Sequence, residues 1–314
     1  MMLFFAINVD ANFIMTKILI SIVGPTAIGK TALSIKLAQH FNTEIISADS
    51  RQFFKEMTVG TAVPSTEELN TTKHHFIQHI SIKDNYSVGD FERDAISKIE
   101  SIHKNNDIAI MVGGSGLYVK AVTKGLDHFP DVDKHIRTEL NKRLINEGIE
   151  TLQKQLKSLD FKAYQSIAID NPQRIIRALE VCIGSGQPYS SFLTKTEKTR
   201  PFKVVTIGLS AVRSIIYDRI NQRVDIMVNE GLIEEAKELL PNKHLNALNT
   251  VGYKELFNYF EGEWTLDFAI SEIKKNTRRF AKRQLTWFKK DETIQWFDYT
   301  TDINNIINYL EKQS

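Results

Sequence analysis

A glycine-rich octapeptide directly after an apolar run constrains the fold of this 314-residue chain more than any other feature. The run at 17–23 is short, β-branched and apolar on both faces, as in a central strand of a parallel sheet. The octapeptide has the pattern G-x-x-x-x-G-K-T, and apolar residues follow at helical spacing over 31–40. This order predicts a phosphate-binding loop made of Gly24, Pro25, Thr26, Ala27, Ile28, Gly29, Lys30 and Thr31.

Each part of this loop has a chemical reason. The glycines let backbone N–H groups close around a di- or triphosphate, and the helix N-terminus adds a favourable dipole. The ammonium of Lys30 would reach the terminal phosphate, and the hydroxyl of Thr31 would hold Mg²⁺. The motif leaves open whether the phosphates are a fuel, a phosphoryl donor or a leaving group.

Further buried strands are expected at 44–47, 108–112 and 204–208, with helical patterns around them. The sequence therefore predicts an α/β fold like that of P-loop NTPases, with a mostly parallel sheet flanked by helices. From 131 to 183 only helical spacing is seen, and further helices are expected at 213–230, 232–240 and 268–290. We expect a core of residues 16–127 and 200–314, a helical insertion at 128–199, and an extension at 1–15 that is loose or a mis-assigned start.

The composition excludes several classes of protein. Apolar residues make up 42% and charged residues 25%, values that are typical of a soluble globular protein. The one cysteine, Cys182, excludes an internal disulfide framework and a thiolate zinc cluster. No stretch approaches the roughly 20 apolar residues of a membrane span. We therefore expect a cytoplasmic protein without a membrane partner.

The net charge of +2 hides an uneven distribution. Eight basic residues and no acidic one stand between 273 and 290, which leaves the remaining chain with 32 bases and 38 acids. Within this segment Phe280, Gln284, Trp287 and Phe288 follow helical spacing toward a core, leaving an outward basic stripe suited to phosphates. The stripe points to an anionic partner, although charge runs are often merely solvated faces.

Asp49 follows the second expected strand and would lie beside the phosphate loop. It could serve as a general base toward a hydroxyl in a small-molecule kinase or toward an amine in another transferase, or it could simply form a turn. An ATPase would show an Asp at the end of a further strand, but 108–112 ends in Gly113-Gly114-Ser115-Gly116. Asp107 stands at the wrong end of that strand, which disfavours motor-type hydrolysis.

Two further features face the same edge of the expected sheet. The glycine-rich segment at 113–116 directs N–H groups and the Ser115 hydroxyl toward the crevice, unless it is a simple loop. Arg219 and Arg223 are four residues apart on one helix face, where they could stabilise a diphosphate or pair with Asp218 and Asp225.

Together the motifs closely resemble those of bacterial tRNA dimethylallyltransferases over roughly residues 16–290. The matching segments are Gly-Pro-Thr-Ala-x-Gly-Lys-Thr at 24–31, Ser-Ala-Asp-Ser-Arg-Gln at 47–52, Gly-Thr-Ala at 60–62, Val-Gly-Gly-Ser-Gly-Leu-Tyr at 112–118, Asn-Pro-Gln-Arg-Ile-Ile-Arg-Ala-Leu-Glu at 171–180, Val-Gly-Tyr-Lys-Glu at 251–255 and Ala-Lys-Arg-Gln-Leu-Thr-Trp-Phe at 281–288.

The resemblance implies that the loop holds dimethylallyl diphosphate and that the isoprenoid passes to N6 of the adenosine on the 3′ side of the anticodon. Asp49 then matches the base that deprotonates the adenine amine. Lys30, Thr31 with Mg²⁺, and Arg219 or Arg223 would neutralise the departing diphosphate, and we favour Arg223. Ser115 stands where many members carry Thr.

The resemblance also implies tRNA as partner, with the adenine flipped out of its stack. The insertion would grip the anticodon stem-loop from one side and the basic helix from the other. The implied tRNA-contacting residues are Asp49, Ser50, Arg51, Gln52, Ser115, Arg137, Gln173, Arg174, Ile175, Ile176 and Arg177, to which the basic stripe adds Lys282 and Arg283.

Two competing interpretations remain. A nucleoside or shikimate-type kinase shares the phosphate loop and Asp49 but has no use for the insertion or the basic helix. An isopentenyltransferase of free adenine nucleotides shares the chemistry, yet usually lacks the C-terminal part that would grip tRNA. We expect a monomer.

Overall fold

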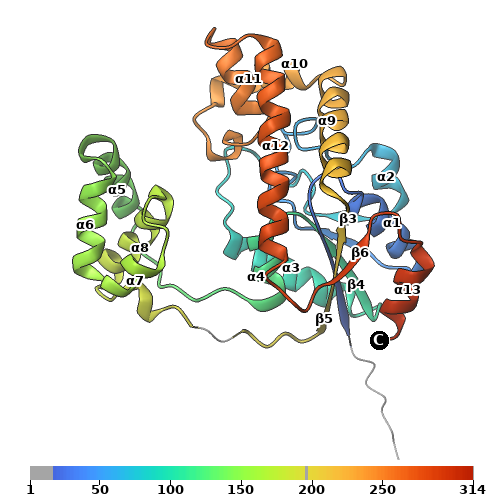
Figure 1. Cartoon of the computed structure of the whole chain (residues 1–314). Helices are drawn as coiled ribbons and strands as arrows, with labels where there is room; N and C mark the ends of the chain where they lie inside the picture. Colours follow the sequence, from blue (N-terminus) through green and yellow to red (C-terminus); the bar gives the residue numbers. More distant parts are fainter. Residues whose placement is uncertain (1–16, 195–196, 314) are drawn as a thin grey trace, which may run out of the picture. The chain divides into compact units, whose positions relative to one another are not determined.

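The structure, a computed structural model, describes residues 17–194 and 197–313. It divides into two compact units, which are residues 125–198 and the remainder of the chain. The larger unit contains a sheet with helices on both faces, and the regular elements in the described part of the smaller unit are all helices (Figure 1). The extension expected at residues 1–15 lies outside the described residues.

The larger unit is built on a six-stranded sheet in the order β3-β2-β4-β1-β5-β6. All five pairings are parallel, which confirms the predicted fold class. Two edge strands were not expected, because β3 has only two residues and β6 lacks a buried apolar run. The strands are β1 (Ile18–Val23), β2 (Ile45–Ser47), β3 (His74–His75), β4 (Ile108–Val112), β5 (Lys203–Ser210) and β6 (Gln295–Asp298).

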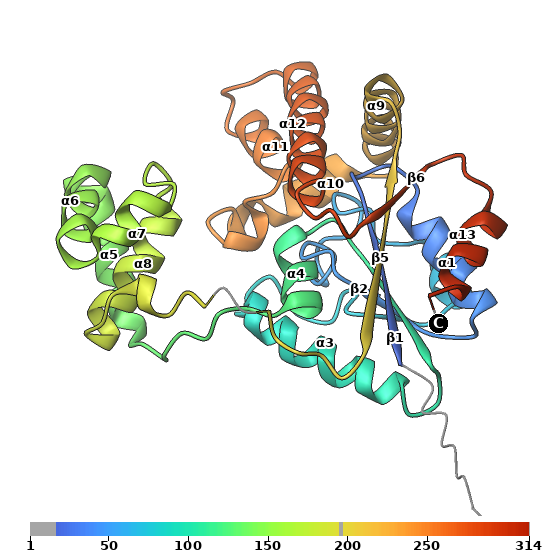
Figure 2. The ribbon, with the colours of Figure 1, turned by 60° about the horizontal axis from the view of Figure 1, so that its bottom comes forward.

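Alternate side chains of the buried central strand β1 pack on opposite faces of the sheet. Ile18, Ile20 and Ile22 pack with α1 (Lys30–His40) and α13 (Ile303–Glu311). Leu19 and Val23 pack with α3 (Val88–Ile102) and α4 (Gly116–Lys124). Figure 2 shows α1 and α13 on one side of the sheet and α3 and α4 on the other. The chain therefore leaves β1 and β4 toward opposite faces, which opens a crevice at the carboxyl edge of the sheet.

A third apolar cluster joins the C-terminal helices of the larger unit to the segment after β2. The long helix α12 lies beside α9, and both run past the carboxyl edge of the sheet (Figures 1 and 2). The remaining elements of this unit are α2 (Thr66–Thr71), α9 (Arg213–Asn229), α10 (Leu232–Leu239), η2 (Leu240–Asn242), η3 (Asn246–Leu248), α11 (Tyr253–Phe260) and α12 (Leu266–Phe288).

The smaller unit has its own core, in which Leu140, Leu152 and Leu156 meet the buried face of α8. Helix α8 begins at an Asn171 cap followed by proline and ends at Gly186 in the left-handed region. Its elements are α5 (Lys134–Glu147), α6 (Ile149–Leu159), α7 (Phe161–Ser166), α8 (Pro172–Ser185) and η1 (Tyr189–Ser191). In the described part of either unit, no helix has the length and apolar character needed to cross a membrane.

Candidate active site

The phosphate loop connects β1 to α1 through backbone conformations that favour glycine. Gly24 has a φ of 146°, and a Cβ added there would lie 2.5 Å from the carbonyl oxygen of Leu209. Ala27 and Gly29 also have positive φ angles, of 63° and 108°. The Nε of Arg219 donates to the carbonyl oxygen of Ala27 at 2.7 Å, so α9 supports the loop from outside. The predicted strand, loop and helix are therefore all present.

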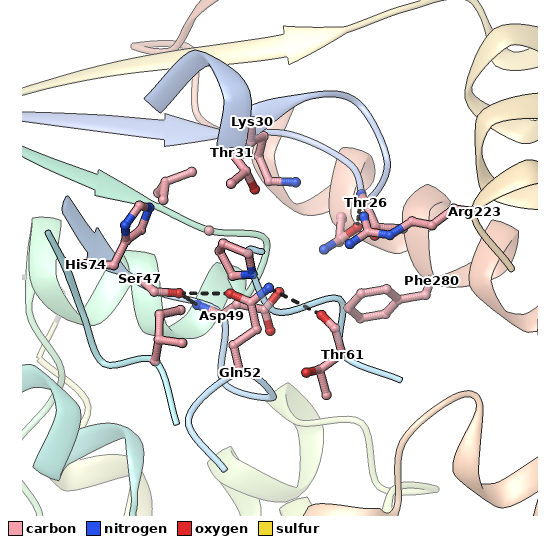
Figure 3. A pocket seen from close by; sticks show the side chains of 15 residues that line it. Thr26, Lys30, Thr31, Ser47, Asp49, Gln52, Thr61, His74, Arg223 and Phe280 are labelled. Atoms are coloured by element: carbon pink, nitrogen blue, oxygen red, sulfur yellow. Dashed lines mark hydrogen bonds between the residues drawn. The ribbon is translucent and has the colours of Figure 1, made fainter. Parts of the chain in front are cut away.

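Two adjoining cavities lie at this edge of the sheet. The smaller one, of about 70 Å³, is lined by Lys30, Thr31, Asp49 and Arg223, among others. Figure 3 shows Lys30 entering from α1 and Arg223 from α9, with Asp49 on the opposite side. The larger cavity, of about 530 Å³, shares Asp49 and Arg223 with the smaller one. Both predicted cationic groups and the predicted base therefore face one connected space.

The charges in this space influence one another. Burial lowers the pKa of Lys30 to about 8, partly opposed by the carboxylate of Asp49 and reinforced by Arg223. Burial likewise lowers the pKa of Arg223, again opposed by Asp49. The Nζ of Lys30 donates to the carbonyl oxygen of Pro25 at 2.8 Å and makes no ion pair in the described part of the chain. An anion entering the cavity would restore favourable electrostatics to both cations.

The two arginines of α9 have different surroundings. Arg223 lines both cavities, whereas Arg219 lines neither. The guanidinium of Arg219 lies 5.4 Å from the centre of the Tyr299 ring, in addition to its bond to the phosphate loop. Arg223 is thus the one placed to meet a ligand directly, and Arg219 holds the loop that would bind it.

Asp49 lies in a turn whose position is fixed by the neighbouring strand. The N–H of Ala48 donates to the carbonyl oxygen of Val112 at 2.7 Å, and the N–H of Arg51 donates to Oδ1 of Asp49 at 3.1 Å. The turn interpretation of Asp49 is therefore correct for one oxygen. Its other carboxylate oxygen accepts no hydrogen bond from the described residues, so a proton acceptor remains available in the cavity.

The glycine-rich segment after β4 closes tightly on its surroundings. A Cβ on Gly113 would lie 2.4 Å from the carbonyl oxygen of Ala48. Ser115 Oγ accepts from the N–H of Ser50 at 3.1 Å and lies 3.1 Å from Ser50 Oγ. Ser115 and Ser50 therefore form one polar group beside Asp49, at the edge of the larger cavity.

Gln284 is a site residue whose bonds the sequence did not predict. It is buried on α12, and its Oε1 accepts from the N–H of Thr26 in the phosphate loop at 2.9 Å. Its Nε2 donates to the carbonyl oxygen of Gly114 at 2.9 Å. One amide side chain thereby joins the two glycine-rich loops that border the cavity.

Phe280 and Trp287 overturn an expectation from helical spacing. We expected both to face the core together with Gln284 and Phe288, but only the latter two are buried. Phe280 is 38% exposed and Trp287 42% exposed, and both line the larger cavity. Spacing identified the correct face of α12, but part of this face borders a cavity. The cavity thereby gains an apolar, aromatic wall next to the anion-binding loop.

Comparison with known proteins adds to this geometry. A family model described as IPP transferase matches residues 52–291. The chain belongs to this family. A tRNA dimethylallyltransferase of Flavobacterium johnsoniae is 63% identical over 300 residues, covering 94% of this chain and 97% of the relative.

Solved structures agree with the sequence relatives. The full-length tRNA isopentenylpyrophosphate transferase of Bacillus halodurans matches with a TM-score of 0.71 and 39% identity, covering 94% of this chain and 96% of that protein. A eukaryotic dimethylallyltransferase acting on tRNA matches with a TM-score of 0.77 and 25% identity, covering 95% of this chain and 77% of that one. Both the fold and the transferase class of the IPP transferase family are thereby shown for this chain.

In this member of the IPP transferase family, the basic segment of α12 is only partly free. Lys274 pairs with Asp225 at 2.5 Å, Lys275 pairs with Glu272 at 2.6 Å, and Arg278 donates to Asn221. The continuous outward stripe that we expected is therefore interrupted, because its first half is bound to the chain itself. Lys282, Arg283, Lys289 and Lys290 are exposed and have no carboxylate partner among the described residues.

The segments expected to touch tRNA also perform structural tasks. Arg51 donates to the carbonyl oxygens of Asn246 and Ala247, at 3.2 and 3.0 Å. The Nε2 of Gln52 donates to the carbonyl oxygens of Thr61 and Ala62, at 3.2 and 2.9 Å. Both side chains are therefore held in place by their own chain before any RNA arrives.

The smaller unit corrects part of the expected tRNA contact set. Ile175 and Ile176 are fully buried in its core, so their side chains cannot touch RNA while this core is intact. Arg137 and Arg177 both approach Glu180, at 3.8 and 3.3 Å. The exposed residues at the start of α8 are Gln173 and Arg174.

Proposed function

We propose that this protein transfers a dimethylallyl group from dimethylallyl diphosphate to N6 of the adenosine on the 3′ side of the tRNA anticodon. One observation carries the proposal: an anion-binding loop with two half-buried cations opens directly into an apolar, aromatic-lined cavity that contains a carboxylate. A small-molecule kinase with a polar acceptor needs the loop but not the apolar wall, and a nucleoside kinase, which could stack its base there, is not favoured by the family match. An isoprenoid diphosphate has chemistry that suits both parts.

The diphosphate is the leaving group in this reaction. The bond between C1 of the isoprenoid and the ester oxygen of the adjacent phosphate breaks. The negative charge that grows on the diphosphate is stabilised by Lys30 and Arg223. Backbone N–H groups of the loop at 24–31 and the N-terminus of α1 add to this stabilisation. Arg219 and Gln284 keep the loop in shape through their bonds to Ala27 and Thr26.

Mg²⁺ is the proposed metal, and the residues present fit it. Among the described residues, no three His, Cys, Asp or Glu side chains form a metal site of their own. The Thr31 hydroxyl offers an oxygen atom in the smaller cavity, and the phosphate oxygens of the substrate would supply further ligands, which suits a hard cation. When bound, Mg²⁺ would neutralise part of the diphosphate charge.

Asp49 is the proposed general base. Its oxygen without a hydrogen bond would take a proton from the N6 amine as the nitrogen bonds to C1 of the isoprenoid. The adenine must leave its stack to enter the cavity, where Phe280 and Trp287 offer aromatic surfaces. Ser50 and Ser115 supply hydrogen-bonding hydroxyls beside Asp49.

The RNA-contacting residues are proposals as well. Lys282 and Arg283 are exposed bases suited to RNA phosphates, and Arg283 also lines the larger cavity. In the helical unit at 125–198, which we propose contacts the anticodon stem-loop, the candidates that remain are Arg137, Gln173, Arg174 and Arg177. We further propose that the enzyme works as a monomer and, because its substrate is tRNA, in the cytoplasm.

An acceptor assay tests this function against its nearest competitor. The protein is incubated with labelled dimethylallyl diphosphate, Mg²⁺ and either unmodified tRNA or AMP, and the RNA is then digested to nucleosides. We expect label in a modified adenosine from tRNA and none in AMP. Label in AMP alone would favour an isopentenyltransferase of free nucleotides.

A further inference from the structure

The loop between residues 57 and 63 is held by a carboxylate from a distant helix. Thr58 and Val59 donate their N–H groups to Oε2 of Glu235 on α10, both at 2.8 Å. The N–H of Gly60 and the hydroxyl of Tyr253 donate to Oε1, at 2.8 and 2.7 Å. Four donors thus converge on one carboxylate, whose oxygens only accept.

This contact unites two motifs for which the proposed reaction has no role so far. Gly-Thr-Ala at 60–62 and Val-Gly-Tyr-Lys-Glu at 251–255 lie far apart in the sequence. Tyr253 is fully buried, and a Cβ added to Gly60 would lie 2.5 Å from its ring. Only glycine allows the loop to approach this ring so closely.

The loop leads directly to the Asp49 turn. The carbonyl oxygens of Thr61 and Ala62 accept from Nε2 of Gln52, and Ala62 has a left-handed φ of 48°. The backbone N–H of Gln52 donates to the carbonyl oxygen of Asp49 at 3.1 Å. Ser47 Oγ donates to Gln52 Oε1 at 3.3 Å and accepts from the N–H of Asp49 at 3.4 Å (Figure 3).

We propose that Glu235 is a positioning residue for the Asp49 base, acting through the loop at 58–62 and through Gln52. The inference rests on the proposed function. Glu235 lines neither cavity, so it does not touch the substrates there. Without its carboxylate, three backbone N–H groups lose their partner and the loop can move, carrying the Asp49 turn with it. Misplacing a reacting group by about 1 Å can cost about 100-fold in rate.

The test is the nearly isosteric substitution Glu235→Gln, with Glu238→Gln on the exposed face of the same helix as control. The amide turns an NH₂ group toward backbone donors, so we expect kcat for prenyl transfer to tRNA to fall about 10- to 100-fold. The melting temperature should fall below that of the control because backbone donors lose an acceptor, whereas the KM values for donor and tRNA should change less than kcat. Tyr253→Phe removes one donor and should give a smaller loss in kcat.

A second substitution distinguishes positioning from a general structural effect. In the Asp49→Ala background, adding Glu235→Gln should not lower the residual rate further, because the group being positioned is absent. An undiminished effect of Glu235→Gln in that background, or an unchanged kcat in the single variant, would overturn the proposal. Activity of the unaltered protein on tRNA and on AMP, measured in the same assay, tests the proposed function separately, and the Glu235 comparison holds on either acceptor.

Discussion

Basic and acidic residues lie at both ends of the parallel strands, but they pair with each other only at the amino ends. At the amino edge, Lys17 and Asp107 pair at 2.8 Å, and their side chains are about 40% exposed. At the carboxyl edge, Lys30, Arg223 and Asp49 line one cavity, and none of them forms an ion pair with another described residue. Charges that neutralise each other leave nothing for a ligand, whereas charges held apart by separate elements are available for binding and catalysis.

The largest difference in kcat should appear between variants of the two aspartates, Asp49 at the carboxyl edge and Asp107 at the amino edge. Asp49→Ala should retain tRNA binding but lower kcat roughly 10²- to 10⁴-fold, the usual contribution of a positioned general base. Asp107→Ala removes only an exposed ion pair, worth about 0–1 kcal/mol, and should leave kcat unchanged. Single-turnover rates and tRNA affinities of both variants measure the difference. Equal losses in kcat for the two variants would contradict the assignment of catalysis to the carboxyl edge.

The arginines of α9 sharpen the comparison within the carboxyl edge. Arg223→Gln removes a cation that lines the cavity, and kcat should fall about 10²- to 10³-fold. Arg219→Gln removes a hydrogen bond that supports the loop, so its loss should stay within about tenfold. Steady-state kinetics with saturating tRNA compare them. A larger loss for Arg219 would reassign the direct diphosphate contact.

The affinity for diphosphate should depend on pH through Lys30. Because burial lowers the pKa of this ammonium to about 8, it loses its charge as pH rises through 8 instead of near its ordinary value. Measured relative to Lys30→Met, which shares the ionisation of the ligand itself, the affinity for inorganic diphosphate should therefore be constant below pH 8 and weaken above it, by at most about tenfold per pH unit.

Titration calorimetry in buffer free of divalent metal, from pH 6.5 to 9.5, measures this dependence, with Lys30→Met as the matched variant. The variant should bind more weakly and lack the inflection near pH 8 that Lys30 contributes. An inflection of unchanged size in Lys30→Met would mean that another group titrates.

The smallest effect concerns the two halves of α12. Replacing Lys282 and Arg283 with alanine should weaken tRNA binding and reduce the slope of log K against log salt by about 2. Replacing Lys274 and Lys275 should change this slope little, because their ammonium groups already pair with Asp225 and Glu272. Donor affinity should be the same in both variants. Equal slopes for both pairs would show that exposure does not select the RNA contacts.

Local patterns predicted the strands of the sheet centre and the phosphate loop, because β-branched runs and glycine spacing act over a few residues. They did not predict β3 or β6, which have no apolar run of their own. The position of Asp49 at the cavity followed from its place after a strand. Short sequence segments were therefore enough to predict the phosphate loop and the position of Asp49 in the site.

The remaining site features depend on distant contacts. Gln284 binds residues that lie 258 and 170 positions away, and no local pattern reports such bonds. Helical spacing placed Phe280 and Trp287 on the correct face of α12, but spacing cannot tell a packed core from a cavity. Ile175 and Ile176 show the opposite error. They belong to a motif that we expected to contact tRNA, but they are buried in the core.

The most direct test of the account asks which part of a phosphate donor reaches the acceptor. The protein is supplied with unmodified tRNA, Mg²⁺ and either dimethylallyl diphosphate labelled in the isoprenoid or ATP labelled in its terminal phosphate. The account predicts isoprenoid label in tRNA, release of unlabelled diphosphate, and no transfer from ATP. Transfer of the ATP label to any acceptor would show that the charges at the carboxyl edge serve phosphoryl transfer, and would contradict it.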